Sequence, residues 1–399
     1  MFENDETYGK KAILGQVFDS EQEIFYNGYV LTEGEKIVET GPAENLPSCT
    51  DMKIIDTKGK YIVPGLIDGH NHLYLDPGSF QLMSESSVPD LFYRMIRNAQ
   101  QHVHDGVTAM RECGTPHFLD GEVKKMIDGH VIDGPTLMTC GEWITASNGH
   151  GSFEGCAQIA DGEWEIRKAV RTIVRHNVDY IKVMVTGGNA TVWAEPGHNF
   201  YSLDELRALV DEAKANGKEV GAHCHSELGA KYAVEAGVTM LEHGSLLTSD
   251  EIINLLKEHN IIWTFNQHQR FADPDPRVPA YKLKRTREGR DKSIIAVKKA
   301  LKAGITICAG CDGYHANSAF VWALEGMVKS GATSKQALII GTKNPGKAFF
   351  KGERGILKAG TYADIIVSEE NPQENISALR NLKLVIKNGK VVRDELDKA

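Results

Sequence analysis

The feature that most constrains the fold is a regular alternation of short β-branched runs with amphipathic helical patterns through the middle of the chain. Helical periodicity is clear in residues 91–104, 163–176 and 205–215. The expected strands are 62–67, 107–111, 136–141, 180–185, 219–222, 239–242, 261–265 and 305–309. Such alternation is typical of an α/β fold with parallel strands, and eight repeats favour a (β/α)8 TIM barrel over a doubly wound sheet, which is the alternative.

Both ends of the chain have a different pattern, in which short strands are separated by turns. Asn27-Gly28 lies between apolar runs near the N-terminus, and Asn388-Gly389 lies in a similar setting near the C-terminus. This dipeptide predicts a tight hairpin turn between two strands. We therefore expect residues 1–62 plus 355–399 to form one small β-sandwich domain, and residues 63–354 to form the barrel domain.

Composition limits the possible partners and the location of the protein. The net charge is -9, so the chain has no general basic excess for binding nucleic acid. No apolar run approaches the roughly 18 residues of a membrane-spanning helix, and the first ten residues lack the features of a secretory signal. Seven scattered cysteines, an odd number, do not suggest a disulfide framework. We expect a cytoplasmic homo-oligomer that acts on a small molecule.

Residues able to carry out chemistry gather at the C-terminal ends of the predicted strands, where the reactive groups of such barrels lie. They are His70 and His72 after the first strand, His150 after the third, Lys182 in the fourth, His223 and His225 at the fifth, His243 at the sixth, and Asp312 at the eighth. Side chains two apart on a strand point the same way, so His70 and His72 can bind one cation together. Each histidine alone could be a strand cap or a core residue, but the whole set predicts a metal site.

Lys182 is unusual because its neighbours Ile181, Val183 and Met184 are all apolar. A buried ammonium costs several kcal/mol unless it is paired. One interpretation is therefore a buried salt bridge, or a side chain that reaches out to water. The other is an uncharged amine that has reacted with CO2 to give a carbamate, whose two oxygens can bridge two metal ions.

Several segments in the expected order resemble motifs of the amidohydrolase superfamily. Residues 63–72 (VPGLIDGHNH) resemble its opening motif, and residues 147–151 (SNGHG) resemble a loop of the imidazolonepropionase-like and prolidase-like branch. The other matching segments are 106–111 (GVTAMR), 181–182 (IK), 222–225 (AHCH), 241–244 (LEHG), 309–312 (AGCD) and 355–364 (GILKAGTYAD). Asn148 and Cys311 depart from the usual residues of these motifs, but no candidate ligand is missing.

The resemblance implies a (β/α)8 barrel with a two-metal centre and a small β-sandwich built from both termini. The resemblance implies that His70 and His72 bind the more buried metal ion, that His223 and His243 bind the other, and that Lys182 bridges the two ions as N6-carboxylysine. It implies that Asp312 is both a metal ligand and the catalytic acid/base. It further implies that His150 is catalytic and binds the substrate carbonyl, and that His225 binds substrate. The cofactors would be two divalent ions, with zinc expected.

The activity implied by the resemblance is hydrolysis of an amide or peptide C–N bond by a metal-bridging hydroxide. A dipeptide or an N-acyl amino acid is the expected substrate. One alternative is opening of a cyclic amide or deamination, as in imidazolonepropionase-like or aminohydrolase enzymes. Deaminases of the superfamily usually lack the lysine ligand, so the presence of Lys182 makes deamination the less favoured of these reactions. Another alternative is a non-catalytic barrel, but such relatives have lost ligands that are all present here.

Two charged features outside this set have simpler explanations. Arg111 and Glu112 are expected to form an ion pair at the end of the barrel. Residues 277–290 contain a basic run with Lys282, Lys284 and Arg285. This run predicts a solvated helix face, and the alternative is an electrostatic guide for acidic substrates.

Overall fold

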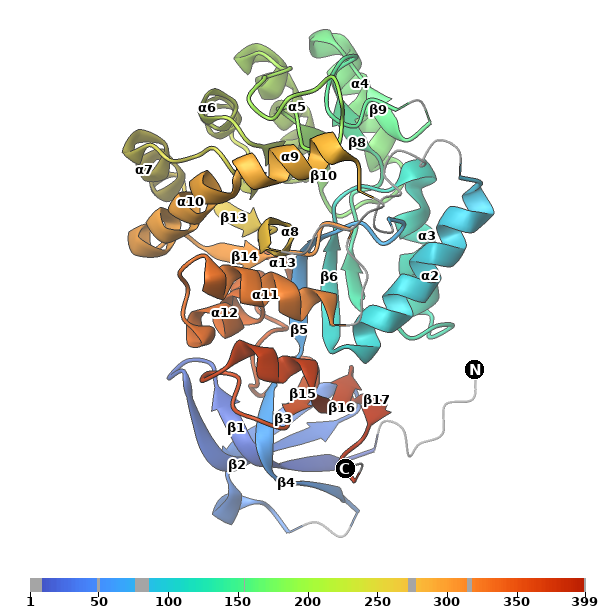
Figure 1. Cartoon of the computed structure of the whole chain (residues 1–399). Coiled ribbons are helices and arrows are strands. Elements are labelled where there is room, and N and C mark those ends of the chain that lie inside the picture. Colours follow the sequence, from blue (N-terminus) through green and yellow to red (C-terminus); the bar gives the residue numbers. More distant parts are fainter. Residues whose placement is uncertain are drawn as a thin grey trace.

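The computed structural model describes residues 9–48, 51–75, 86–153, 155–271, 278–313 and 318–397. It has an α/β architecture in which helices surround a set of parallel strands, and a strand-rich part lies at one end (Figure 1). That part combines the blue N-terminal and the red C-terminal segments of Figure 1. The described N-terminal and C-terminal segments therefore lie side by side.

The strands of the middle region pair in parallel in two sheets. The first sheet has the order β5 (Leu66–Asn71), β6 (Val107–Glu112) and β7 (Thr136–Met138). The second has the order β14 (Ile307–Ala309), β13 (Ile262–Phe265), β12 (Met240–His243), β11 (Val220–Cys224), β10 (Ile181–Met184), β8 (Trp143–Thr145) and β9 (Ala157–Ile159). Strands are present near all eight predicted positions, and β8 and β9 are additional.

Hydrogen bonds also connect the two sheets to each other. The backbone N–H of Asp312, just after β14, donates to the carbonyl of His70 in β5 at 2.9 Å. On the other side, the N–H of Asp179 before β10 donates to the carbonyl of Thr139 after β7 at 2.8 Å. Both sheets consequently direct the C-terminal ends of their strands to one side of the molecule.

The predicted first strand, 62–67, is in fact divided between two sheets. The strand β4 (Lys53–Pro64) ends in the terminal sheet, and β5 begins at Leu66. Gly65 between them donates its N–H to Asp364 of the terminal region, whereas Leu66 donates to Gly106 of the parallel region. A side chain at Gly65 would collide with Thr108, so the chain crosses between the sheets at a position without one.

Helices follow most of the parallel strands and cover them on the outside (Figure 1). The predicted helices are confirmed in position as α2, α4 and α5, and α5 begins with a capping box between Ser202 and Glu205. The described helices are α2 (Val88–His104), α3 (Leu119–Asp128), α4 (Gly162–Val174), α5 (Leu203–Ala215), α6 (Glu227–Ala236), α7 (Asp250–Glu258), α8 (His268–Phe271), α9 (Ala280–Glu288), α10 (Arg290–Ala303), α11 (Ala319–Lys329), α12 (Ser334–Ile340) and α13 (Lys343–Phe349). Their apolar faces pack on the strands in one large core.

The two chain ends share a seven-stranded sheet, in which β4 of the N-terminal part pairs with β15 of the C-terminal part. Its order is β17 (Lys390–Asp394), β16 (Leu382–Lys387), β15 (Ile365–Ser368), β4, β1 (Lys11–Asp19), β2 (Ile24–Glu33) and β3 (Lys36–Pro42). Apolar residues are buried on it in two separate clusters, one around Ile13 and one around Tyr29.

Of the two predicted hairpin turns, one is confirmed and one is wrong. Asn388 and Gly389 both have positive φ and connect β16 to β17. Asn27 and Gly28 instead lie within β2, paired with β1. A side chain at Gly28 would collide with the Tyr26 ring and a neighbouring backbone carbonyl, so close packing requires this glycine, not a turn.

Two further expectations concern cysteines and membranes. The described cysteines, namely Cys113, Cys140, Cys156, Cys224, Cys308 and Cys311, are all buried and form no disulfide. No helix within the described ranges has the length and apolar character needed to span a bilayer.

Candidate active site

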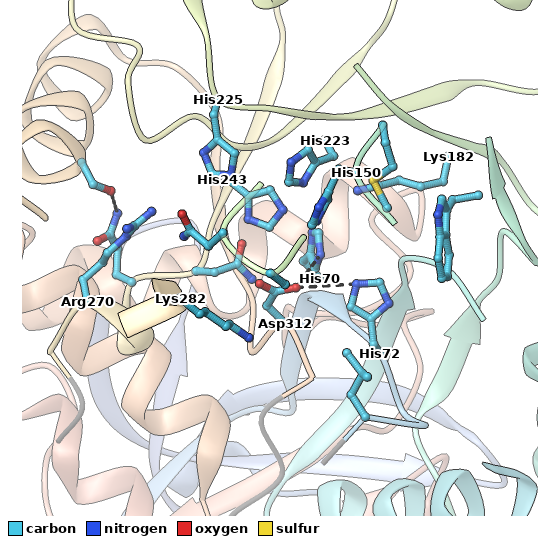
Figure 2. A pocket seen from close by; sticks show the side chains of 18 of the residues that line it. His70, His72, His150, Lys182, His223, His225, His243, Arg270, Lys282 and Asp312 are labelled. Atoms are coloured by element: carbon cyan, nitrogen blue, oxygen red, sulfur yellow. Dashed lines mark hydrogen bonds and ion pairs between the residues drawn. The ribbon is translucent and has the colours of Figure 1, made fainter. Parts of the chain in front are cut away.

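All eight residues singled out from the sequence line one pocket at the C-terminal ends of the parallel strands. Figure 2 shows their side chains directed toward one another around this pocket. They are His70, His72, His150, Lys182, His223, His225, His243 and Asp312. The separations along the chain are large, so the parallel strands bring together groups that the sequence scatters.

The local backbone explains how these side chains reach the pocket. His70 lies in β5, Lys182 in β10 and His223 in β11, while His243 is the last residue of β12. His243 and Asp312 adopt positive φ values of 67° and 54°. L-residues rarely adopt this conformation, and it costs free energy that the surrounding structure must supply. Strain at two candidate ligands is typical of a functional site.

The imidazoles lie close enough to share cations. The ring centroid of His243 is 4.6 Å from that of His223, 4.8 Å from that of His70 and 5.1 Å from that of His225. Among the described residues, three groups have possible ligand atoms within 4.8 Å of one another: His70 with His243 and Asp312, His223 with His225 and His243, and His70 with Cys113 and Glu242. The Asp312 carboxylate is 3.2 Å from Nε2 of His70 and 3.6 Å from Nε2 of His72.

Burial keeps most of these histidines uncharged. Removal from water lowers the pKa of His72 to about 3 and that of His150 to about 4. For the same reason the pKa values of His223, His225 and His243 are well below the usual range. A neutral imidazole keeps a free lone pair, which is the form that binds a metal ion.

His70 behaves differently because negative groups surround it. Burial opposes its charged form, yet the nearby Cys113 and Glu242 and the hydrogen bond with Asp312 raise its pKa well above the usual range. Its Nδ1 is 2.7 Å from Glu242, and its Nε2 faces Asp312. The position between His70 and Asp312 therefore favours positive charge.

Glu242 is the centre of a fully buried network that the sequence analysis did not identify. Its carboxylate accepts from Nδ1 of His70 and from Arg111, and Nζ of Lys182 is 4.0 Å away. A side chain at Gly221, on the neighbouring strand, would collide with Arg111. Glycine at this position thus leaves the space in which the guanidinium reaches Glu242.

The predicted ion pair of Arg111 with Glu112 is wrong. Adjacent residues on a strand point to opposite faces, and the Glu112 carboxylate instead accepts from Leu73 N and Thr115 Oγ1, the latter at 2.7 Å. Arg111 pairs with Glu242, and its Cζ lies 4.1 Å from the centre of the Tyr180 ring. Spacing along the chain could not reveal a partner on another strand.

Lys182 is completely buried, and its amine has no hydrogen-bond partner in the described part of the chain. The nearest carboxylate is Glu242 at 4.0 Å, which already accepts hydrogen bonds from Arg111 and His70. The amine is therefore poorly compensated as a simple ammonium group.

His150 is oriented by Thr191, which was also missed. Nδ1 of His150 is 2.8 Å from Thr191 Oγ1, and that oxygen accepts from the N–H of Gly151 at 3.0 Å. If the threonine hydroxyl donates to Nδ1, Nε2 of His150 carries the proton. A side chain at Gly188 would collide with the His150 ring, so the backbone of residue 188 supports the ring directly.

His225 is oriented in a similar way by Ser245, whose Oγ is 2.6 Å from Nδ1. Its ring lies beside those of His223 and His243, with ring centroids 4.8 Å and 5.1 Å away (Figure 2). The pocket includes further residues that the sequence analysis did not assign to the site: Tyr74, Leu75, Met184, Asn189, Ala190, Asn266, Gln267, Arg270 and Ser293. No motif pointed to them, because most lie in the loops between elements.

The sequence profile of the Amidohydrolase family matches residues 61–392, most of the chain. The chain belongs to the amidohydrolase family. Ochratoxinase from Aspergillus niger is 27% identical over 81% of this chain and 73% of its own length. Imidazolonepropionase from Geobacillus sp. (strain WCH70) is 24% identical over 94% of this chain and 92% of its own.

The fold agrees with that of solved amidohydrolases. A prolidase complexed with N-methylphosphonate-L-proline superposes with a TM-score of 0.89 at 22% identity, and the match covers 96% of this chain and all of the prolidase chain. The family match confirms the predicted superfamily, and the protein is a hydrolase of this superfamily.

We predict that Glu242→Gln lowers the free energy of unfolding by about 3 kcal/mol, because it leaves Arg111 buried without a counter-charge. Chemical denaturation of metal-free protein measures this. The control is Glu251→Gln, which removes a surface pair with Lys231 and should change stability by less than about 0.5 kcal/mol. Similar effects of the two substitutions would show that the network does not stabilise the fold.

Proposed function

We propose that this amidohydrolase holds two divalent metal ions in a closed (β/α)8 barrel and hydrolyses the amide C–N bond of a dipeptide or an N-acyl amino acid. The observation that supports this most directly is that six candidate ligands, scattered along the chain, line the same pocket: His70, His72, Lys182, His223, His243 and Asp312. The proposal includes a separate domain formed by residues 1–62 plus 355–399. Cytoplasmic location and homo-oligomerisation stay predictions.

The residues of the pocket fit a metal pair. The donors are imidazole nitrogens and a carboxylate, which suit zinc and similar ions. The negative groups around His70 favour a cation next to Asp312, and the Lys182 amine, which makes no hydrogen bond within the described residues, is available to react with CO2. In that reaction the amine nitrogen bonds to the carbon of CO2 and loses a proton, which gives an anionic carbamate. Two carbamate oxygens would replace one poorly compensated ammonium.

In the proposed mechanism the residues of this chain manage the protons and the charge. Bound divalent metals supply Lewis acidity, which lowers the pKa of a water molecule and polarises a carbonyl group. Asp312 accepts the proton from the attacking water and then donates it to the leaving nitrogen. His150 presents Nε2–H to the oxygen of the tetrahedral intermediate, since Thr191 engages Nδ1. His225 contacts the substrate beside this position.

A second candidate function is hydrolysis of a cyclic amide, and similarity to imidazolonepropionase supports it. Deamination is less well supported, because Lys182 is present in the pocket. A panel of dipeptides, N-acetyl amino acids and one cyclic amide, such as hydantoin, tests the choice with metal-loaded protein. We expect release of free amino acids from the acyclic amides. Ring opening of the cyclic amide alone, or release of ammonia alone, would contradict the proposal.

We predict that Lys182→Ala lowers kcat/KM more than about 100-fold and reduces the bound metal well below two ions per chain, because the bridging ligand is lost. Metal content and the rate of amide hydrolysis are measured on the same sample. Lys284→Ala, at an exposed position on α9, serves as the control. Full metal content and activity in the Lys182 variant would refute the bridging role.

We predict that His150→Ala keeps its metal ions but lowers kcat by about 100-fold to 1,000-fold, because a donor to the developing oxyanion is removed. The exposed His198 provides the control variant His198→Ala, which should retain the activity of the unmodified protein. Loss of metal from the His150 variant would instead assign this residue to the ligand set.

A further inference from the structure

One wall of the pocket carries two cations that the proposed mechanism does not use. They are Arg270 in α8 and Lys282 in α9, and both line the pocket. Figure 2 shows them on the side away from Lys182. Within the described ranges, neither has a carboxylate at ion-pair distance. Asp312 is the only carboxylate among the described lining residues, so neither cation has a carboxylate of its own in the pocket.

The Arg270 side chain is fixed in place and has only 6% exposure. Its Nη1 donates to the carbonyl of Thr286 at 2.8 Å, and the small Gly289 leaves room for the guanidinium. Burial lowers its pKa to about 10, so it remains charged at neutral pH. A buried guanidinium without a counter-ion is costly, and binding of an anion would offset that cost.

Lys282 and Arg270 reach the pocket from different helices, α9 and α8. In Figure 2 the two side chains enter the pocket from separate positions. Two separate cations can therefore pair with two separate anionic groups of one ligand.

Two amide side chains of the same pocket have buried polar atoms that find no hydrogen bond within the described part of the chain. Both polar atoms of Asn266 are buried without a hydrogen bond, and so is Oε1 of Gln267, whose Nε2 donates to Ser293 at 2.6 Å. Asn266 is 8% exposed and Gln267 is 1% exposed, and both line the pocket. Buried amide groups without a hydrogen bond are rare in proteins unless a ligand or a water molecule supplies the missing partner.

Building on the proposed function, we propose that the leaving half of the substrate is an acidic amino acid with two carboxylates. One carboxylate pairs with Arg270 and the other with Lys282, while Asn266 and Gln267 hydrogen-bond to the polar groups between them. The preferred substrates are then N-acyl derivatives of aspartate or glutamate, or dipeptides that end in these residues. The basic run of the sequence thus contributes Lys282 to the site, while Lys284 of the same helix is exposed.

The products allow a binding test that does not depend on hydrolysis. Calorimetry with metal-loaded protein compares L-glutamate with L-glutamine and L-aspartate with L-asparagine. We expect at least one acid to bind about tenfold or more tightly than its amide, the effect of one charged hydrogen bond. One of the variants Lys282→Met and Arg270→Met, the one that removes the cation facing the side-chain carboxylate, should reduce this preference to less than about threefold, and the other should weaken binding of the acid and the amide alike. Arg270→Lys retains the charge and should bind the acids more tightly than Arg270→Met does, and Lys284→Met is the matched control.

Equal binding of each acid and its amide, no binding of either acid, or a preference that survives both methionine variants would overturn the inference. The same comparison applies to hydrolysis of N-acetyl-L-glutamate and N-acetyl-L-glutamine. Hydrolysis of both at equal kcat/KM would refute the acidic specificity but leave the amidohydrolase function intact. Tight binding of the acid without hydrolysis of any amide in the panel would support the binding site for acidic groups but refute the proposed amide hydrolysis.

Discussion

The buried carboxylate of Glu242 connects the parts of the candidate active site. It accepts hydrogen bonds from Arg111 of β6 and His70 of β5, and it is the carboxylate nearest to Lys182 of β10. One negative charge thus joins several strands inside the parallel region. Such a charge is tolerated away from water only because the basic groups compensate it. The bond to Nδ1 of His70 also leaves Nε2 facing the pocket, where a cation is favoured.

Several other features of the pocket are energetically unfavourable for the protein without a ligand. Among the described residues, a buried lysine amine has no hydrogen-bond partner, neutral imidazoles converge, and two ligand candidates hold strained backbone conformations. Folding alone gains nothing from these features, since each of them costs free energy. A bound metal pair would offset the cost at the centre, and an anionic substrate would offset it at Arg270 and Lys282. Both proposals therefore rest on the same physical reasoning, applied to different walls of one pocket.

The sequence predicts which side chains line the pocket better than it predicts their hydrogen-bond and ion-pair partners. Strand periodicity and the placement of His, Lys and Asp at strand ends were enough to single out eight side chains that line one pocket, while their roles stay predictions. The partner of Arg111 could not be predicted, because it lies on a strand that is distant along the chain. Thr191 and Ser245, which orient His150 and His225, are in loops without periodic patterns. Gly28 was misassigned because the same residue serves a tight turn or a close contact inside a sheet, and only the tertiary structure distinguishes the two.

The most direct test of the metal centre is an anomalous difference map from crystals of zinc-loaded protein, collected on both sides of the zinc absorption edge. The account predicts two peaks in the pocket, both within bonding distance of the proposed ligands, and electron density for a carbamate on Lys182. A single peak that Lys182 does not touch, or density for a free lysine amine turned toward Glu242, would contradict it.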